Sequence, residues 1–450
     1  MVKGDKKIIR AWTMYDWANS AYSLTVTSAV FPAFYVGITS AFGEEKVAQE
    51  YGAPAASLYP WALSVGFLIV ALLAPILSGI ADSRGNKKAF LKLFCYLGAS
   101  ACAGLFFFSM EHLWVGLTLV ALACVGFSGS LTFYDAFLPE IADEADHDRV
   151  SARGYTMGYI GSVILLVLNL AMVMMPDAFF IPDTITLFGR DWGAVPARLS
   201  FLSVGLWWAG WAQIAFRRLP DATASHVDAS VGVVANGYRE LRATWRTLGT
   251  TTRLKRYLIA FFVLNMGIQT VMYLAANFAK QEVKELDATG QAVPIGDASL
   301  ITSILIIQLV AIPGAILFVR LSKRFGNVNA LIIGAVVWII ACLCAFRVVW
   351  ATEFYLLAGL VGLIMGGSQA LTRSTYSKFL PETTDTASFF SFYDVSYYVG
   401  TVLGTTAYGI VYALTNDLRY TIIAIGGFFV LGLLLLWRVP KEETPGPATS

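Results

Sequence analysis

The heptapeptide YDAFLPE at residues 134–140 recurs as YSKFLPE at residues 376–382, with five identical positions and an offset of 242 residues. Two further sets repeat at an offset of 246: Gly154 and Gly158 recur as Gly400 and Gly404, and Arg10 and Asn19 recur as Arg256 and Asn265. Chance rarely gives five matches in seven, so the chain is a duplication of one unit. We expect the glycine pairs to let helices approach closely where the two halves move against each other.

The composition is that of a membrane protein. The 450 residues are 57% hydrophobic and only 14% charged, and the mean hydropathy is +0.65. Such a chain is not a soluble enzyme, and a formal net charge of +2 gives no basic field for nucleic acid. All five cysteines lie in apolar stretches and the three histidines are scattered, so we expect no disulfide, metal site or cofactor.

Twelve apolar stretches are long enough to cross a bilayer, which takes about 20 residues each. The first follows Arg10 and ends at about Thr39, and the others cover about 58–81, 89–110, 112–137, 154–175, 197–216, 257–279, 298–319, 328–349, 354–377, 389–413 and 419–437. The sequence therefore predicts an all-α membrane protein with two pseudo-symmetric six-helix bundles, at residues 1–216 and 256–450. Residues 217–255 form a linker between them.

The distribution of basic residues predicts the orientation in the membrane. With both termini inside, 25 of the 32 Lys and Arg residues fall on the cytoplasmic side and 7 on the other. Because positive charge is enriched in cytoplasmic loops, we expect a multi-pass protein of the cytoplasmic membrane with both termini in the cytoplasm. Nothing in the sequence calls for an oligomer, so we expect a monomer in contact with membrane lipids.

Part of the cytoplasmic linker has a helical pattern. Apolar residues recur at spacings of three and four beside several arginines: Val231, Val234, Tyr238, Leu241, Trp245 and Leu248. Two interpretations fit this pattern equally well: a helix lying on the inner leaflet, and an amphipathic linker helix packed on the bundles.

The loop after the second span carries a recognisable charge pattern. Residues 78–88 read SGIADSRGNKK, and the second copy reads KRFG at residues 323–326. The first loop resembles the signature of the major facilitator superfamily in its Asp, its Gly and its paired basic residues, although Ser78 and Ser83 depart from that signature. The resemblance implies that Asp82, Gly85, Lys87 and Lys88 help to close the cytoplasmic side, so these four are the candidate gating residues. A generic tight turn with cytoplasmic charges accounts for the basic residues but not for the Asp-x-x-Gly spacing.

The first span carries a more specific signature. Residues 12–22 read WTMYDWANSAY and are followed by Phe31 and Pro32. This run resembles the "unknown major facilitator" family, relatives of the autophagy-linked vacuolar amino-acid effluxers of fungi. The resemblance covers nearly the whole chain and implies a secondary transporter, but it supplies no substrate. A weaker similarity links the chain to the glycoside and hexuronide cation symporters.

Polar residues follow helical stripes in some spans and are nearly absent from the ninth and twelfth. Because polar side chains within a bilayer turn toward protein or water, the stripes predict helices that line a shared cavity. The candidate substrate-binding or coupling residues are Tyr15, Asp16, Asn19, Tyr22, Asp135, Asn265, Gln269, Gln369, Arg373 and Asp394. Tyr15 and Tyr22 flank Asn19 and suit the cavity, whereas Trp12 suits the interfacial aromatic belt.

Four of these residues are ionisable side chains within spans, namely Asp16, Asp135, Arg373 and Asp394. A lone charge in a bilayer costs about 2.5–3.5 kcal/mol, so such residues are usually paired or functional. They fit a coupling site, in which Arg373 neutralises one carboxylate and another binds and releases a proton. They also fit a gate, in which Asp16 or Asp135 of the first half pairs with Arg373 of the second half and closes the cytoplasmic side. For Asp135 and Asp394 a third interpretation is purely structural: each caps a helix end or extends from it toward water. The acidic run at residues 143–148 is interpreted as a solvated, ion-paired loop and not a metal site.

These patterns predict a carrier that moves a small polar or amphipathic solute by alternating access. The surplus of acids within the spans leads to the hypothesis of proton coupling, and sodium is the other candidate ion. The family resemblance suggests neutral amino acids as the first substrates to consider, transported by efflux. A cation-coupled glycoside or sugar symporter is the alternative. A receptor or scaffold that does not transport is a third, and it would tolerate apolar residues in the polar stripes. The sequence has neither a nucleotide-binding loop nor a nucleophile and base pair of an enzyme.

Overall fold

The computed structural model describes residues 3–221 and 233–442, and these are almost entirely helical. The first half contains α1 (Lys6–Ala21), the π-helical η1 (Tyr22–Val30), α2 (Phe31–Phe42), α3 (Glu44–Tyr51), α4 (Ala55–Arg84), α5 (Lys87–Gly104), η2 (Leu105–Phe107), η3 (Met110–His112), α6 (Leu113–Asp135), α7 (Leu138–Ile141), η4 (Glu144–Asp146), α8 (His147–Met174), η5 (Pro176–Phe179), β1 (Thr184–Leu187), β2 (Arg190–Gly193) and α9 (Val195–Arg218). The second half contains α10 (Val233–Thr250), α11 (Thr252–Glu282), β3 (Lys284–Leu286), β4 (Ala292–Pro294), α12 (Asp297–Phe325), α13 (Asn327–Arg347), α14 (Ala351–Phe379), α15 (Thr386–Thr415) and α16 (Leu418–Trp437).

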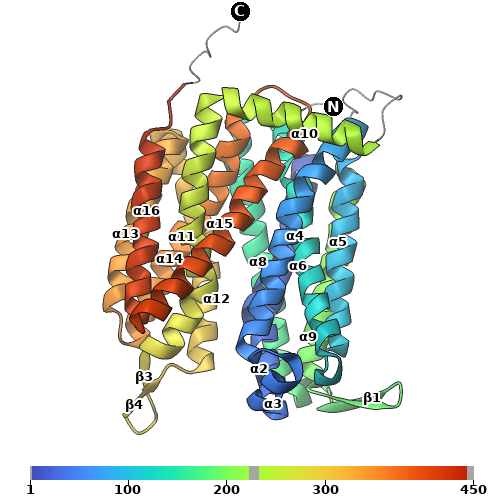
Figure 1. The fold of residues 1–450 in the computed structure, drawn as a ribbon, viewed down its shortest axis with the longest axis vertical. Coiled ribbons are helices and arrows are strands. Elements are labelled where there is room, and N and C mark those ends of the chain that lie inside the picture. Colours follow the sequence, from blue (N-terminus) through green and yellow to red (C-terminus); the bar gives the residue numbers. More distant parts are fainter. Residues whose placement is uncertain (1–2, 222–232, 443–450) are drawn as a thin grey trace, which may run out of the picture.

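Two bundles of long helices stand side by side, one drawn from blue to green and the other from yellow to red (Figure 1). The short antiparallel hairpins β1–β2 and β3–β4 lie at one end of the bundles, and α10 crosses the other end. We refer to these as the hairpin end and the α10 end. The predicted pair of pseudo-symmetric six-helix bundles is confirmed.

Eleven continuous helical stretches of the described chain are long and apolar enough to cross a membrane. The twelfth predicted span, α15, has 30 residues but is more polar, because Asp394, Thr401 and Thr405 lie along its cavity side. The first span is one helical stretch from Lys6 to Phe42 whose middle, η1, has π-helical hydrogen bonding. The periodicity of the sequence did not predict this local widening of the helix, which is frequent at functional sites.

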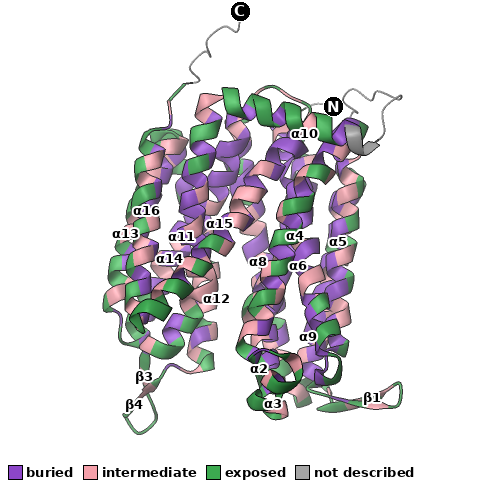
Figure 2. Cartoon of the chain, viewed as in Figure 1, coloured by how far each residue is buried: buried purple, intermediate pink, exposed green. Residues whose placement is uncertain are grey.

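Burial follows the pattern expected of a protein in lipid. Figure 2 shows exposed residues along the outer helices and buried residues between the bundles and inside them. On the outer helix α13, Leu343 is 66% exposed, and on α16, Ile423 is 57% exposed. Apolar side chains on such faces are stable in contact with acyl chains.

The repeated glycine pairs pack inside each bundle. A side chain at Gly154 or Gly158 of α8 would overlap α1, and a side chain at Gly404 of α15 would overlap the carbonyl of Met266 on α11. The expectation that these glycines lie where the halves move against each other holds for Gly154, which also meets Arg373 of the second bundle. It is wrong for Gly158, Gly400 and Gly404, whose nearest neighbours belong to their own bundle. The first and fifth helices of a bundle are neighbours, so the glycines fix each bundle as a rigid unit.

The helix predicted in the linker is α10, which packs mainly on α4 and also contacts α11 and α15. Gly237 lies directly on Gly79 and Ile80 of α4, and the Trp245 ring packs at a tilt against Phe392 of α15, with 5.4 Å between the ring centroids. Trp245 is nevertheless 61% exposed, while Leu248 is buried. The helix thus has one side packed on the bundles and an exposed aromatic side, and its position on the inner leaflet stays a prediction. Val231 lies outside the described residues.

Candidate functional site

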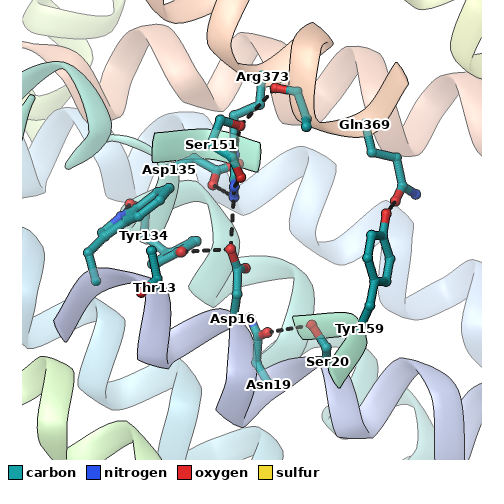
Figure 3. A network of polar contacts seen from close by, with 12 residues as sticks. Thr13, Asp16, Asn19, Ser20, Tyr134, Asp135, Ser151, Tyr159, Gln369 and Arg373 are labelled. Carbon is teal, nitrogen blue, oxygen red and sulfur yellow. Dashed lines mark hydrogen bonds and ion pairs between the residues drawn. The ribbon is translucent and has the colours of Figure 1, made fainter. Parts of the chain in front are cut away.

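Arg373 of α14 binds two carboxylates of the opposite bundle, as Figure 3 shows. Its Nη1 donates to Asp135 Oδ1 at 2.9 Å, and its Nη2 lies 3.3 Å from Asp16 Oδ2. The hydroxyl of Tyr134 donates to the same Asp16 oxygen at 2.8 Å. Arg373 is 1% exposed and both aspartates are 5% exposed, so the three side chains form a buried ionic triad, Asp16–Asp135–Arg373.

Serine and aromatic rings complete the surroundings of the guanidinium. Nε donates to Ser151 Oγ at 3.0 Å, and Nη2 donates to the carbonyl of Ser151, also at 3.0 Å. The guanidinium lies over the rings of Tyr155, 4.2 Å from the centroid, and Trp12, at 4.8 Å. Arginine is stable in a buried site when its donors are satisfied and aromatic faces cover it.

Trp12 is therefore part of the site. It is 0% exposed, its ring stacks on Tyr134 at 4.4 Å, and its Nε1 donates to the Tyr134 carbonyl. The expectation that Trp12 belongs to the interfacial belt is wrong, because the cation of Arg373 gives this ring a partner inside the protein.

A cavity between the bundles reaches from the hairpin end down to the triad. Its outer compartment has a volume of about 340 Å³ and is bordered by residues near the ends of α2, α4, α12 and α14, such as Pro32, Pro60 and Leu300. The inner compartment, of about 160 Å³, is lined by Asp16, Asp135 and Arg373. The two compartments share Thr27, Ser28, Met272, Tyr273 and Gln308.

Most of the other predicted site residues lie around the inner compartment. Asn19, Gln269, Gln369 and Asp394 line it directly. The Tyr159 hydroxyl donates to Gln369 Oε1 at 2.7 Å, opposite the triad in Figure 3.

Asn265 lies just behind the wall of this compartment. It accepts from Gln269 Nε2 at 3.2 Å and donates to the carbonyl of Tyr397 at 2.7 Å. It therefore positions Gln269 and joins α11 to α15.

Tyr15 and Tyr22 lie elsewhere, buried inside the first bundle, and the expectation that they face the cavity is corrected. Tyr15 packs on Tyr134 and Tyr22 packs on Trp208, at ring distances of 5.0 and 5.9 Å. Since each residue turns an α-helix by about 100°, both tyrosines point well away from the direction of Asp16.

The candidate gating residues lie at the α10 end. Asp82 accepts hydrogen bonds from the backbone N–H groups of Ala387 and Ser388, at 3.3 and 2.7 Å, in the first turn of α15. Gly85 ends α4 in the left-handed conformation, with φ of 65°, which suits glycine. A carboxylate at a helix N-terminus is favoured by the exposed N–H groups and the helix dipole.

The two lysines of the motif have different roles. Lys87 Nζ lies 2.8 Å from Thr386 Oγ1 of the opposite bundle and forms an ion pair with Glu140. Lys88 instead donates to the carbonyl of Leu219 and pairs with Asp221, within its own half of the chain. Lys87 thus bridges the bundles and Lys88 does not.

A second polar contact between the bundles was missed by the sequence analysis. Asp148, at the start of α8, accepts from Ser322, Asn327 and Lys378, each at 2.7 or 2.8 Å. Asp148 is 4% exposed, so this residue of the acidic run is buried and not solvated. It stands in the first turn of the fifth helix, as Ala387 and Ser388 stand in the first turn of the eleventh. The α8–α12 contact thus mirrors the α4–α15 contact.

A glycine is required beside the triad, which gives a first testable prediction. A Cβ at Gly154 would meet Asp16 Oδ2, Arg373 Nη2 and the Trp12 ring. We expect Gly154→Ala to lower stability by about 1–3 kcal/mol through overpacking, measured as a lower apparent Tm in detergent. Gly210→Ala, on the open side of α9 with nothing within 4 Å, is the matched control. Equal melting temperatures for the two variants would contradict this packing.

The fold, the cavity between two bundles and the buried charges define a transporter of the major facilitator superfamily, and not an enzyme. Residues 4–445 match the family described as "Vacuole effluxer Atg22 like", and the chain belongs to this family. The resemblance predicted from residues 12–22 is confirmed.

The similar proteins agree. An uncharacterized MFS-type transporter of Bacillus subtilis, YxiO, is 30% identical over 99% of this chain and 97% of its own length. Autophagy-related protein 22-2 of Neosartorya fischeri is 21% identical over 86% of this chain and 75% of its own length. Among solved structures, the Escherichia coli fucose:proton symporter FucP has a TM-score of 0.67 at 14% identity, covering 97% of this chain and 98% of that one.

Proposed function

We propose that this transporter is a proton-coupled carrier of a small polar or amphipathic solute, with neutral amino acids as the first substrates to test. The observation that carries the proposal is the contact of Arg373, from the second bundle, with Asp16 and Asp135 of the first bundle at the floor of the cavity. An ionic contact between two bundles changes whenever the bundles rock, so the charge state of the triad is linked to the conformation.

The ionisable side chains of the inner compartment carry an excess of negative charge unless a further cation binds there. Asp16, Asp135 and Asp394 line the inner compartment, and Arg373 is the one basic residue among its lining residues. With all four ionised, the compartment carries two uncompensated negative charges in a buried place, which is unfavourable. Protons are the simplest compensating cations, and this supports proton coupling.

The cavity opens toward one end of the bundles, and contacts between the bundles close the other end. The cavity lies toward the hairpin end, while Asp82, Lys87 and Asp148 join the bundles at the α10 end. The excess of Lys and Arg predicted for the cytoplasmic side lies at the α10 end. We therefore propose that the α10 end faces the cytoplasm, that both termini are cytoplasmic and that the protein resides in the cytoplasmic membrane. Residues 1–216 and 256–450 are then the moving bundles.

The chemistry of the inner compartment supports a zwitterionic solute. A neutral amino acid carries one ammonium group, which the carboxylates of the compartment can bind, and one carboxylate group, which the guanidinium can bind once an aspartate of the triad is protonated. Asn19, Gln269 and Gln369 add uncharged hydrogen-bonding groups. The apolar wall of the outer compartment, including Leu63, Phe67 and Ile304, accommodates an apolar portion of the solute.

Transport by reconstituted protein tests the proposal. In proteoliposomes we expect flux of labelled neutral amino acids to increase with a proton gradient, and Asp16→Asn to lower this flux because it removes one anion from the triad. Asp146→Asn, at a surface ion pair with Arg149, is the matched control. Flux that ignores the gradient and is unchanged in Asp16→Asn would refute the proposal. Sodium-driven glycoside uptake would favour the sugar symporter, and an inert protein that tolerates apolar residues in the stripes would favour the scaffold.

A further inference from the structure

Asp394 differs from the other acids of the inner compartment, because no Lys or Arg among the described residues pairs with it. It lies on α15, lines the compartment and is 4% exposed. Its Oδ2 makes no hydrogen bond to any described residue. The guanidinium of Arg373 is already bound by Asp16, Asp135 and Ser151. An ionised carboxylate in such surroundings is costly, whereas a protonated one is a neutral donor that needs an acceptor.

The opposite bundle supplies such an acceptor. The Thr132 hydroxyl, on α6, is 0% exposed and lies beside Asp394, within reach of a hydrogen bond to its carboxyl. A threonine hydroxyl both donates and accepts, so it can donate to an ionised Asp394 and accept from a protonated one. In the protonated state the buried pair carries no charge, and Asp394 donates to Thr132.

The other groups around Asp394 also oppose a negative charge there. The ionisable groups that face it are Asp135 on α6, Tyr376 on α14, and Tyr397 and Tyr398 on its own helix. Helix α11 presents the uncharged Asn265 and Gln269 to α15, and α4 places Asp82 at its first turn. Asp82 is paired there with Lys87, whereas no described Lys or Arg pairs with Asp394.

The duplication provides an internal comparison. Asp148 and Asp394 occupy equivalent positions, each six residues before the repeated glycine pair. Asp148 is bound by Ser322, Asn327 and Lys378. The same position therefore holds a fixed structural acid in one bundle and an acid without a cation in the other.

We infer that Asp394 is the residue that takes up and releases the coupling proton, with Thr132 as its hydrogen-bond acceptor, an inference that rests on the proposed proton-coupled function. The proton reaches the Asp394 carboxylate from water in the cavity and bonds to one carboxylate oxygen. Because α6 and α15 belong to different bundles, opening of the α10 end separates Thr132 from Asp394. The carboxyl then loses its acceptor and releases the proton to the cytoplasmic side.

Infrared difference spectroscopy tests this inference without any solute. For wild-type protein in proteoliposomes, we expect the C=O band of a protonated carboxyl to disappear as the pH is raised. Asp394→Asn is expected to lose this band, and Asp16→Asn is expected to keep it. A titrating band that persists in Asp394→Asn, or no titrating band in the wild-type protein, would overturn the assignment.

A second variant keeps the test valid if Asp394→Asn does not fold. Thr132→Val removes the acceptor and should shift the frequency of the band, while Thr132→Ser restores the hydroxyl and should restore the frequency. An unshifted band in Thr132→Val would refute the role of Thr132. The spectra are independent of transport, so a titrating Asp394 in a protein without proton-driven flux would refute the proposed coupling and leave the proton site established.

Discussion

Replacement of Arg373 by methionine is expected to destabilise the protein by about 3–5 kcal/mol at about pH 8, because two buried carboxylates lose their cation. Asp16 and Asp135 would remain 5% exposed at the floor of the cavity, with only the Tyr134 hydroxyl as a donor to Asp16. The apparent Tm of purified protein in detergent measures the effect. The loss should shrink at about pH 5, since protonation of either aspartate removes a negative charge that Arg373 no longer neutralises.

Two further variants make this experiment specific. Arg373→Lys keeps the positive charge but loses the planar fork that reaches both carboxylates and Ser151, so an intermediate Tm is expected. Arg320→Met makes the same chemical change at an exposed position of α12 and should leave the Tm near that of the wild type. A stable Arg373→Met protein at both pH values would show that the triad does not hold ionised carboxylates together.

The fold was predictable from the sequence because the membrane imposes strong and regular constraints. Span length follows from bilayer thickness, and polar stripes identify the helices that avoid lipid. The repeat of YDAFLPE as YSKFLPE identified the two halves, and the same reasoning selected Asp16, Asp135 and Arg373 as buried charges. Which acid pairs with Arg373 depends on distances between helices, and single-sequence periodicity holds no information about those distances. Arg373 in fact binds both.

The sequence analysis missed the role of Asp148 for an identifiable reason. Asp148 stands in a run rich in acids, where composition indicates solvent exposure, and only its neighbours in space bury it. A usable signal was present in the duplication, because Lys378 replaces Ala136 of the first copy within the repeated heptapeptide. A charge that appears in one copy alone marks a place where the two bundles differ. Lys378 indeed binds Asp148 across the bundle interface.

The role of Asp82 leads to the second large effect. Asp82 receives two N–H donors from the first turn of α15, and hydrogen bonds to a charged group contribute about 1.5–3 kcal/mol each. A change of 1.4 kcal/mol is about tenfold in an equilibrium constant. We therefore expect Asp82→Ala to raise the fraction of molecules open at the α10 end by about tenfold or more.

Alkylation of a buried cysteine at this contact measures the opening. Ser388→Cys is a suitable reporter, because Ser388 is 0% exposed and lies in the contact with Asp82. In a background without the five native cysteines, Asp82→Ala should increase the alkylation rate of the cysteine at position 388 in proportion to the open fraction.

Two lysine variants test the same contact. Lys87→Ala should also increase the alkylation rate, since Lys87 binds Thr386 of the opposite bundle. Lys88→Ala should not, because Lys88 makes its contacts within one half only. Equal rates in the Lys87→Ala and Lys88→Ala proteins would mean that the bundles are held closed elsewhere. The contact of Asp148 with α12, α13 and α14 would then be the one that keeps the α10 end closed.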